Sequence, residues 1–190
     1  TSAAKQVSLT ELGSIKINKE ERTKMYKTIP RSSVIGFLIG VLPGAGATIA
    51  SFLAYGMERN VVNDEEKEKF GKGSVNGLSA PETANNAACS GSFVPMLTLG
   101  IPGSGTTAVM LGALLGFGVQ PGPRLYMTNP EIFWSIIMSM YIGMVILLIL
   151  NLPLIPYIAR ILAVPKNYLI PLILFFSLTG IYVMSFNNFD

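Results

Sequence analysis

The sequence predicts an all-α polytopic membrane protein, with transmembrane helices and two Pro-Gly-interrupted segments, re-entrant or discontinuous, that form an internal repeat. The first observation is composition: 50% of the 190 residues are apolar and only 13% are charged, whereas a soluble domain carries about a quarter charged residues. The second is that 19 of the 25 charged residues lie in positions 1–72. The third is a set of charge-free runs, each long enough to enter or cross a bilayer core, which takes about 20 apolar residues. They are residues 32–57, 83–123, 132–159 and 167–189.

The same composition excludes several classes of protein. The chain has no histidine and one cysteine, which excludes a Ser-His-Asp triad, a disulfide framework and the usual zinc sites. The shortage of charge argues against an ordinary cytosolic enzyme and against a disordered segment. A net charge of +3 is too small to imply nucleic acid as a partner. We therefore expect no enzymatic activity and no cofactor.

Residues 1–31 are polar and basic, with seven Lys or Arg against three acidic residues. They lack the apolar stretch and small-residue cleavage pattern of a signal peptide. A basic flank beside a membrane segment favours the cytoplasmic side, so we interpret this stretch as a basic cytoplasmic linker. Because the first residue is Thr and the chain stops just after an apolar segment, we expect the sequence to be a fragment or a processed piece.

The rest of the chain divides into a core, residues 32–126, and two transmembrane helices within residues 127–190. In the core, a first apolar segment is followed by a charged loop at 58–72 and by a second apolar segment. Pro121-Gly122-Pro123 ends the core, because proline fixes φ and removes a backbone donor. The two predicted helices that follow span residues 133–152 and 168–186.

The two apolar segments of the core are interrupted by the same motif. Pro43-Gly44-Ala45-Gly46-Ala47-Thr48 aligns with Pro102-Gly103-Ser104-Gly105-Thr106-Thr107, with four of six positions identical and an offset of 59 residues. Glycine concentrates in the same region, where 16 of the 19 glycines lie between Gly36 and Gly122. Pro-Gly-x-Gly breaks a helix and lets the backbone approach a ligand closely.

Such breaks predict a binding site for an anion. Unpaired backbone in hydrocarbon costs several kcal/mol, so a broken helix persists only against protein or a water-filled cavity. A helix that restarts at Thr48 or Thr107 presents free N–H groups and a positive dipole end, which bind anions. Two interrupted segments in corresponding positions indicate the substrate site of a secondary transporter. The alternative is that both motifs are kinks in ordinary helices. The predicted site residues are Pro43, Gly44, Gly46, Thr48, Pro102, Gly103, Ser104, Gly105, Thr106 and Thr107.

A second candidate site surrounds Glu82, the one acidic residue of the core outside the charged loop at 58–72. Glu82, Asn85 and Asn86 fall at i, i+3 and i+4, so they share one helical face. A carboxylate beside two amides can bind a small hard cation or relay a proton, and ionisable residues within membranes are functional hypotheses by default. The alternative is that Ser79-x-x-Glu82 is a helix capping box with Pro81 in the first turn.

Several of these segments, in this order, resemble the large membrane subunit of the tripartite tricarboxylate transporters, the TctA-like family. They are Gly40-Val41-Leu42-Pro43-Gly44-Ala45-Gly46, Phe70-Gly71-Lys72-Gly73, Ala80-Pro81-Glu82-Thr83-Ala84-Asn85-Asn86-Ala87, Leu99-Gly100-Ile101-Pro102-Gly103-Ser104 and Pro121-Gly122-Pro123. The resemblance covers residues 32–126, and residues 127–190 match only as hydrophobic helices. It implies a partial chain, covering most of the second half of a longer, two-half protein.

The resemblance also implies a function. The family imports citrate and other carboxylates across the bacterial inner membrane as a multi-pass secondary active transporter, with a small membrane subunit and a periplasmic solute-binding protein as partners. It is driven by symport with a cation, Na⁺ or H⁺, which we assign to Glu82, Asn85 and Asn86. Two alternatives remain: a channel or exchanger for another small anion, and an accessory membrane subunit whose small residues serve helix packing.

Overall fold

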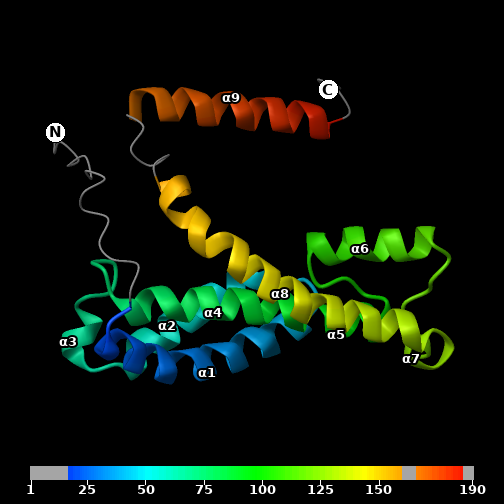
Figure 1. Ribbon diagram of the computed structural model, residues 1–190, viewed down its shortest axis with the longest axis horizontal. Coiled ribbons are helices and arrows are strands. Elements are labelled where there is room, and N and C mark those ends of the chain that lie inside the picture. The colour runs from blue at the N-terminus through cyan, green and yellow to red at the C-terminus, as the bar shows by residue number, and fades with distance from the viewer. Residues whose placement is uncertain (1–16, 160–165, 186–190) are drawn as a thin grey trace. The chain divides into compact units, whose positions relative to one another are not determined.

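The computed structural model describes residues 17–159 and 166–185, and within these ranges the chain is helical and forms no strand (Figure 1). This confirms the predicted all-α class. The chain separates into two compact units: Lys16–Ser139, and a smaller one that takes in the chain from Met140 onward. The predicted sites all fall in the larger unit.

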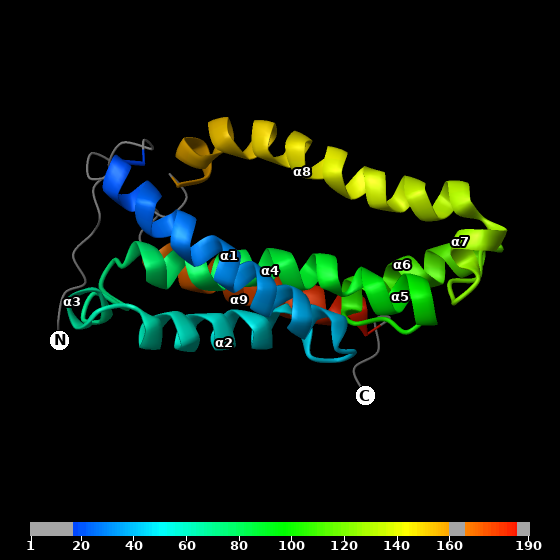
Figure 2. The ribbon, with the colours of Figure 1, turned by 90° about the horizontal axis from the view of Figure 1, so that it is seen from below.

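The larger unit is built on a bundle of three helices. Helices α1 (Lys19–Val41) and α2 (Gly46–Val61) form a hairpin, and both pack against α4 (Val75–Gly91) (Figure 2). The first turn of α1 is fixed by a capping box, in which Asn18 Oδ1 accepts the Glu21 N–H at 2.8 Å and Glu21 Oε2 accepts the Asn18 N–H at 2.8 Å. The basic stretch predicted as a linker is therefore helical from Lys19 onward, and residues 1–16 lie outside the described ranges.

The three helices meet through small residues spaced four apart, so each stripe stays on one helix face. A Cβ on Gly36 would lie 2.6 Å from Ala84 Cα, and one on Gly40 would lie 2.6 Å from Ala88 Cα. Because the partners advance in step along both helices, α1 and α4 run parallel. The buried stripes are Thr28, Ser32, Gly36 and Gly40 on α1, Ala50, Ala54 and Glu58 on α2, and Asn76, Ala80, Ala84 and Ala88 on α4. Close approach through small residues is how helices associate within membranes.

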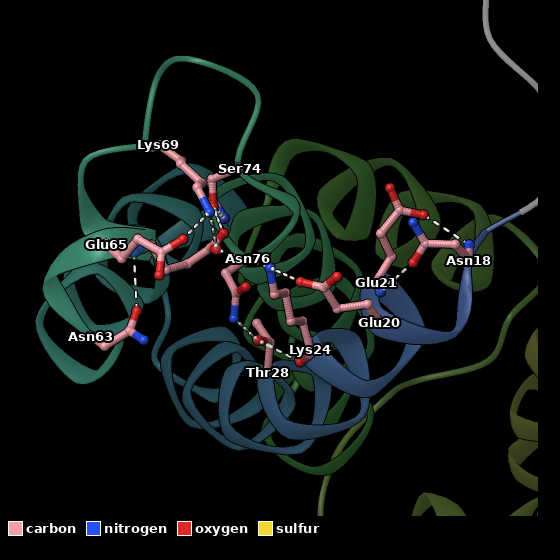
Figure 3. Close-up of polar contacts among 12 residues, drawn as sticks. Asn18, Glu20, Glu21, Lys24, Thr28, Asn63, Glu65, Lys69, Ser74 and Asn76 are labelled. Atoms are coloured by element: carbon pink, nitrogen blue, oxygen red, sulfur yellow. Dashed lines mark hydrogen bonds and ion pairs between the residues drawn. The ribbon is translucent and has the colours of Figure 1, made fainter.

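The short helix α3 (Asp64–Lys67) fastens one end of this bundle through Glu66. The Glu66 carboxylate accepts hydrogen bonds from Lys24 Nζ of α1 at 3.0 Å and from Ser74 Oγ, the N-cap of α4, at 2.9 Å. Figure 3 shows Lys24, Lys69 and Ser74 converging here from three segments. Burial raises the pKa of the Glu66 carboxyl, but the hydrogen bonds from Lys24 and Ser74 outweigh it and hold the pKa below its usual value.

The remainder of the larger unit contains α5 (Phe93–Leu99), α6 (Gly105–Gly116), α7 (Leu125–Thr128) and the start of α8 (Pro130–Ala159). These elements share a second apolar core made of Met96, Leu97, Val119 and Leu125. The Gly122 N–H donates to Leu97 O at 3.1 Å, which ties the Pro121-Gly122-Pro123 segment to the end of α5. As predicted, α6 ends before this segment.

That all four charge-free runs enter or cross a bilayer remains a prediction. Among the described residues, one helical stretch is long and apolar enough to cross a membrane, Pro130–Ile155, with a mean hydropathy of 2.4. The run 32–57 is divided between α1 and α2 by the first Pro-Gly motif. The run 83–123 is divided between α4, α5 and α6, and the second Pro-Gly motif lies between α5 and α6. In the smaller unit, α9 (Lys166–Met184) contains a shorter apolar stretch, Asn167–Val183. Residues 186–190, at the end of the fourth run, lie outside the described ranges.

Candidate functional site

Both Pro-Gly motifs interrupt helices, as the sequence predicts. Helix α1 ends at Val41 and α2 begins at Gly46, while α5 ends at Leu99 and α6 begins at Gly105. The first turn is sharp because Gly44 and Gly46 have φ of +82° and +70°, a conformation that costs glycine nothing and other residues about 1 kcal/mol or more. That these segments are re-entrant and form a repeat remains a prediction.

The structure brings the second break against the end of α1. Gly103 is buried, and a Cβ placed on it would lie 3.0 Å from Ser92 Cβ and 3.5 Å from Gly40 O. Gly40 belongs to the last turn of α1, immediately before the first break. Gly91, at the end of α4, packs against α1 more closely still, since a Cβ on it would lie 2.5 Å from Phe37 O. Glycines therefore form the contacts of the end of α1 with two other places, the junction of α4 with α5 and the second break.

The two breaks differ in how the next helix begins. Ser104 and Thr107 form a capping box at the start of α6: the Ser104 N–H donates to Thr107 Oγ1 at 2.9 Å, and the Thr107 N–H donates to Ser104 Oγ at 3.3 Å. Helix α2 begins after Ala45, whose side chain has no polar atom, and no side chain caps it. We predicted free backbone N–H donors at the start of both helices. No side chain accepts from those of α2, whereas the Thr107 N–H of α6 is already bound by Ser104.

The predicted substrate residues accordingly fall into two groups. Thr107 is 1% exposed, and its hydroxyl also donates to Ser104 O at 2.9 Å, so it serves the helix start. Gly103 is buried with it. The others stand at the surface of the described unit, half-buried at Gly46, Pro102 and Ser104, and exposed at Pro43, Gly44, Thr48, Gly105 and Thr106.

Glu82, Asn85 and Asn86 lie together on one face of α4, as their spacing predicts, and this face points away from α1 and α2. All three side chains are exposed in the described unit. Asn86 Nδ2 donates to Glu82 O at 2.9 Å, while Asn85 Oδ1 lies 3.9 Å from Cys89 Sγ. The Glu82 carboxylate and the two amides thus remain available to a ligand or to another part of the protein.

The alternative interpretation of Ser79-x-x-Glu82 as a capping box is wrong. Helix α4 begins at Val75, and its N-cap is Ser74, whose Oγ accepts the Gly77 N–H at 3.0 Å. Ser79, Pro81 and Glu82 therefore lie inside the helix. Ser74 takes the cap because it directly follows the turn at Phe70–Gly73, where the helix begins.

The structure also contains a buried polar cluster that the sequence analysis missed. Glu58, which begins the segment predicted as a charged loop, lies in the last turns of α2 and is 0% exposed. Its Oε1 accepts hydrogen bonds from Thr28 Oγ1 at 2.8 Å, Arg31 Nη2 at 2.7 Å and Asn76 Nδ2 at 3.1 Å. Asn76 Nδ2 also donates to Thr28 Oγ1 at 2.8 Å (Figure 3). The four-residue spacing of the small-residue stripes would have identified this cluster, because Thr28, Glu58 and Asn76 each end one stripe.

A cleft of about 440 Å³ opens beside this cluster. Arg31 and Asn76 belong both to the cleft wall and to the Glu58 network. The remaining wall is mostly charged and carries both signs. It is lined by Glu20, Lys24, Lys27, Val61, Val62, Asn63, Glu65, Glu66 and Lys69.

Comparison with known proteins gives a family and two relatives. Residues 1–190 match the family described as "Tripartite tricarboxylate transporter TctA family". An "Uncharacterized 52.8 kDa protein in TAR-I ttuC' 3'region" of Agrobacterium vitis is 39% identical over 186 residues, which are 98% of this chain and 37% of that protein. An "Uncharacterized protein in TAR-II ttuC' 3'region" of the same organism is 44% identical over 155 residues, which are 82% of this chain and 63% of that protein.

The chain thus spans less than two thirds of the length of both relatives. No solved structure matches it.

Proposed function

Because the chain belongs to the tripartite tricarboxylate transporter TctA family, we propose that it is part of the large membrane subunit that imports tricarboxylates or related organic acids. The family is one of membrane transporter components and not of enzymes. The proposal concerns the whole subunit, of which this chain supplies the Pro-Gly-interrupted core. Citrate is the substrate we would test first.

The observation that carries the proposal is the contact between the second break and the end of α1. Gly103 of the second motif lies against Ser92 and against Gly40, which stands three residues before the first motif although 59 residues separate the two motifs. The uncapped start of α2 would offer backbone N–H groups to a carboxylate, because a helix N-terminus attracts anions through its dipole. No Lys or Arg lies between Thr83 and Pro123, so backbone donors and Thr48 would hold the substrate.

The proposed driving force is symport with Na⁺ or H⁺ at Glu82, Asn85 and Asn86. Two observations support this assignment. The three residues share one face of α4, and the Glu82 carboxylate forms no ion pair with a cationic side chain among the described residues. A periplasmic binding protein would deliver the substrate to the inner-membrane complex, which also contains a small membrane subunit. One set of interrupted helices would then move against another to release the substrate inside.

Uptake of labelled citrate into proteoliposomes tests this function. The complete transporter is reconstituted with and without the periplasmic binding protein, under an imposed sodium or proton gradient. We expect saturable uptake that requires both the binding protein and one of the gradients. Uptake without the binding protein indicates an exchanger or channel, and uptake of no small organic acid indicates an accessory subunit.

Replacing Glu82 with Gln is expected to reduce gradient-driven uptake by about tenfold or more, because the carboxylate that binds the coupling ion loses its charge. The fold should survive, since Glu82 is exposed and lies mid-helix in α4. Glu65→Gln, which changes an exposed carboxylate on α3, is the matched control. Unchanged uptake and unchanged ion dependence in Glu82→Gln would exclude this residue from coupling.

A further inference from the structure

With the exception of Glu82, the charged side chains of the larger unit gather at its two ends. The first, here called the charged end, is where α3 meets the starts of α1 and α4, because the Glu66 carboxylate accepts hydrogen bonds from Lys24 Nζ at 3.0 Å and from Ser74 Oγ at 2.9 Å. The end of α2 joins them, since Glu58 Oε1 accepts from Asn76 Nδ2 at 3.1 Å. From residue 73 to the end of this unit, the charged residues are Glu82, Arg124 and Glu131.

Arg124 and Glu131 mark the second end, here called the α7 corner, residues 121–134. Neither forms an ion pair among the described residues, and the nearby Tyr126 and Trp134 are 52% and 58% exposed. Figures 1 and 2 show α3 and α7 at opposite ends of this unit. Tyr and Trp beside the start of a long apolar helix are typical of the membrane–water interface. The α7 corner therefore has the composition of a segment that contacts lipid headgroups.

Helices α4 and α5 together lead from the charged end to the α7 corner. Helix α4 has 17 residues and α5 has 7, and Ser92 between them keeps helical dihedral angles, with φ −67° and ψ −16°. The interruption follows from Pro95, which has no N–H to donate to the Gly91 carbonyl. The corner packs on the end of α5, because the Gly122 N–H donates to Leu97 O at 3.1 Å. At about 1.5 Å per residue the pair is about 37 Å long, enough to cross a hydrocarbon core of about 30 Å.

Between the two ends, the exposed surface of α1 and α2 is apolar. Residues 32–57 carry no charge, and large apolar side chains are open on both helices, where Val34 is 60% exposed, Leu38 59% and Phe52 75%. Soluble monomers rarely expose large apolar patches. A band without charge, bounded at each end by charged residues, has the polarity profile of a protein that lies in a bilayer.

The α1–α2 hairpin starts and ends at the charged end and turns back before the α7 corner. Its turn follows Gly40, and a Cβ on Gly40 would lie 2.6 Å from the Cα of Ala88, in the last turn of α4. The turn is therefore level with the start of α5, whose 7 residues extend about 10 Å further. Helix α2 has 16 residues and is about 24 Å long, shorter than the hydrocarbon core. Of α2 and the α4–α5 pair, only the pair is long enough to cross.

We propose that α4 and α5 cross the membrane together as one interrupted helix, with the charged end in the cytoplasm and the α7 corner in the headgroup layer of the outer surface. The direction follows from positive charge, since nine Lys or Arg lie in residues 19–72 and one, Arg124, lies in residues 73–159. Segments on the cytoplasmic side of a membrane carry the excess of Lys and Arg. The loop at 58–72 is thereby assigned to the cytoplasm, together with the start of α1.

This crossing gives the Glu82 face of α4 a position in the membrane. Helix α4 begins at Val75, so Glu82 lies about 10 Å along the crossing, nearer the cytoplasmic surface than the outer one. A carboxylate and two amides that faced lipid would be costly, so this face turns toward the rest of the subunit or a water-filled cavity. The coupling role proposed for these residues rests on transport, whereas the crossing requires only the membrane family to which the chain belongs.

Cysteine accessibility in the complete subunit tests the crossing. Native cysteines, including Cys89, are replaced by alanine. Single cysteines are then introduced at Lys72, an exposed position at the charged end, and at Met127, which is 67% exposed at the α7 corner. Reaction with a membrane-impermeant maleimide is measured in spheroplasts, which present the outer surface, and in sealed inside-out vesicles. Met127→Cys should react in spheroplasts and lose that reaction in the vesicles, whereas Lys72→Cys should show the opposite pattern.

Phe52→Cys is the control for exposure. Phe52 is 75% exposed on α2, more than Met127, so exposure in the chain alone predicts reaction, whereas a thiol in hydrocarbon does not ionise and should not react from either side. Reaction of Phe52→Cys like that of Met127→Cys would overturn the proposal. So would reaction of Lys72→Cys and Met127→Cys from the same side, the reversed pattern, or reaction of either only after detergent dissolves the membrane. Because labelling needs no substrate, the expected pattern in a protein that imports no organic acid would disprove the proposed function and leave the crossing in place.

Discussion

Replacing Gly40 with alanine is expected to prevent the α1–α4 interface from forming in its present register. The added Cβ would overlap Ala88, standing 2.6 Å from its Cα and 2.8 Å from its carbonyl carbon. These are backbone atoms, so no side-chain rotation relieves the overlap and the two helices must separate. Overpacking a tight site commonly lowers the free energy of unfolding by about 1–3 kcal/mol. Because backbone atoms block relaxation here, we expect Gly40→Ala to lower it by at least the upper end of that range.

The measurement is equilibrium or thermal unfolding of the complete subunit in detergent, with the fraction of monodisperse protein as a second readout. Gly56→Ala is the matched control, since Gly56 lies on α2 of the same bundle and a Cβ there meets nothing within 4 Å. Alanine should stabilise that helix by about 0.5–1 kcal/mol relative to glycine. Equal behaviour of the two variants would disprove the parallel pairing of α1 with α4.

The positions of the helix interruptions were predictable from local chemistry, but the way in which the next helix begins after each interruption was not. Proline and glycine set the breaks before α2 and α6 whatever surrounds them. The difference between the two helix starts depends on single atoms: Ser104 can cap, and Ala45, which aligns with it, cannot. A motif alignment that treats Ala and Ser as equivalent small residues hides this difference.

Glu58 escaped sequence analysis for a different reason. Its neighbours in the sequence are charged, so a composition window assigns it to a loop exposed to water. In the structure it is buried, because Thr28, Arg31 and Asn76 from two other helices surround Oε1. Those partners lie 18 to 30 residues away in the sequence. Their contact with Glu58 could be predicted only by comparing the four-residue stripes of three separate segments.

Substituting Gly103 is expected to abolish transport while leaving the protein inserted in the membrane. In the present geometry a Cβ would stand 3.0 Å from Ser92 Cβ and 3.5 Å from Gly40 O, so the larger valine side chain must displace the second break from Ser92 at the α4–α5 junction. A displacement of about 1 Å at a site that positions a reacting or transported group can cost about 100-fold. Citrate uptake by Gly103→Val should therefore fall by about that factor or more.

The close contact also predicts a rescue. The nearest obstacle is the Cβ of Ser92, which Ser92→Gly removes, so Gly103→Ala/Ser92→Gly should regain uptake that Gly103→Ala alone loses. Gly112→Ala on α6, where a Cβ meets nothing within 4 Å, controls for the general effect of filling a glycine. Normal uptake by Gly103→Val would remove the argument that this glycine serves close approach. Loss of uptake without rescue would instead assign Gly103 to the conformation of the break itself, because the space beside it would then no longer be the limiting factor.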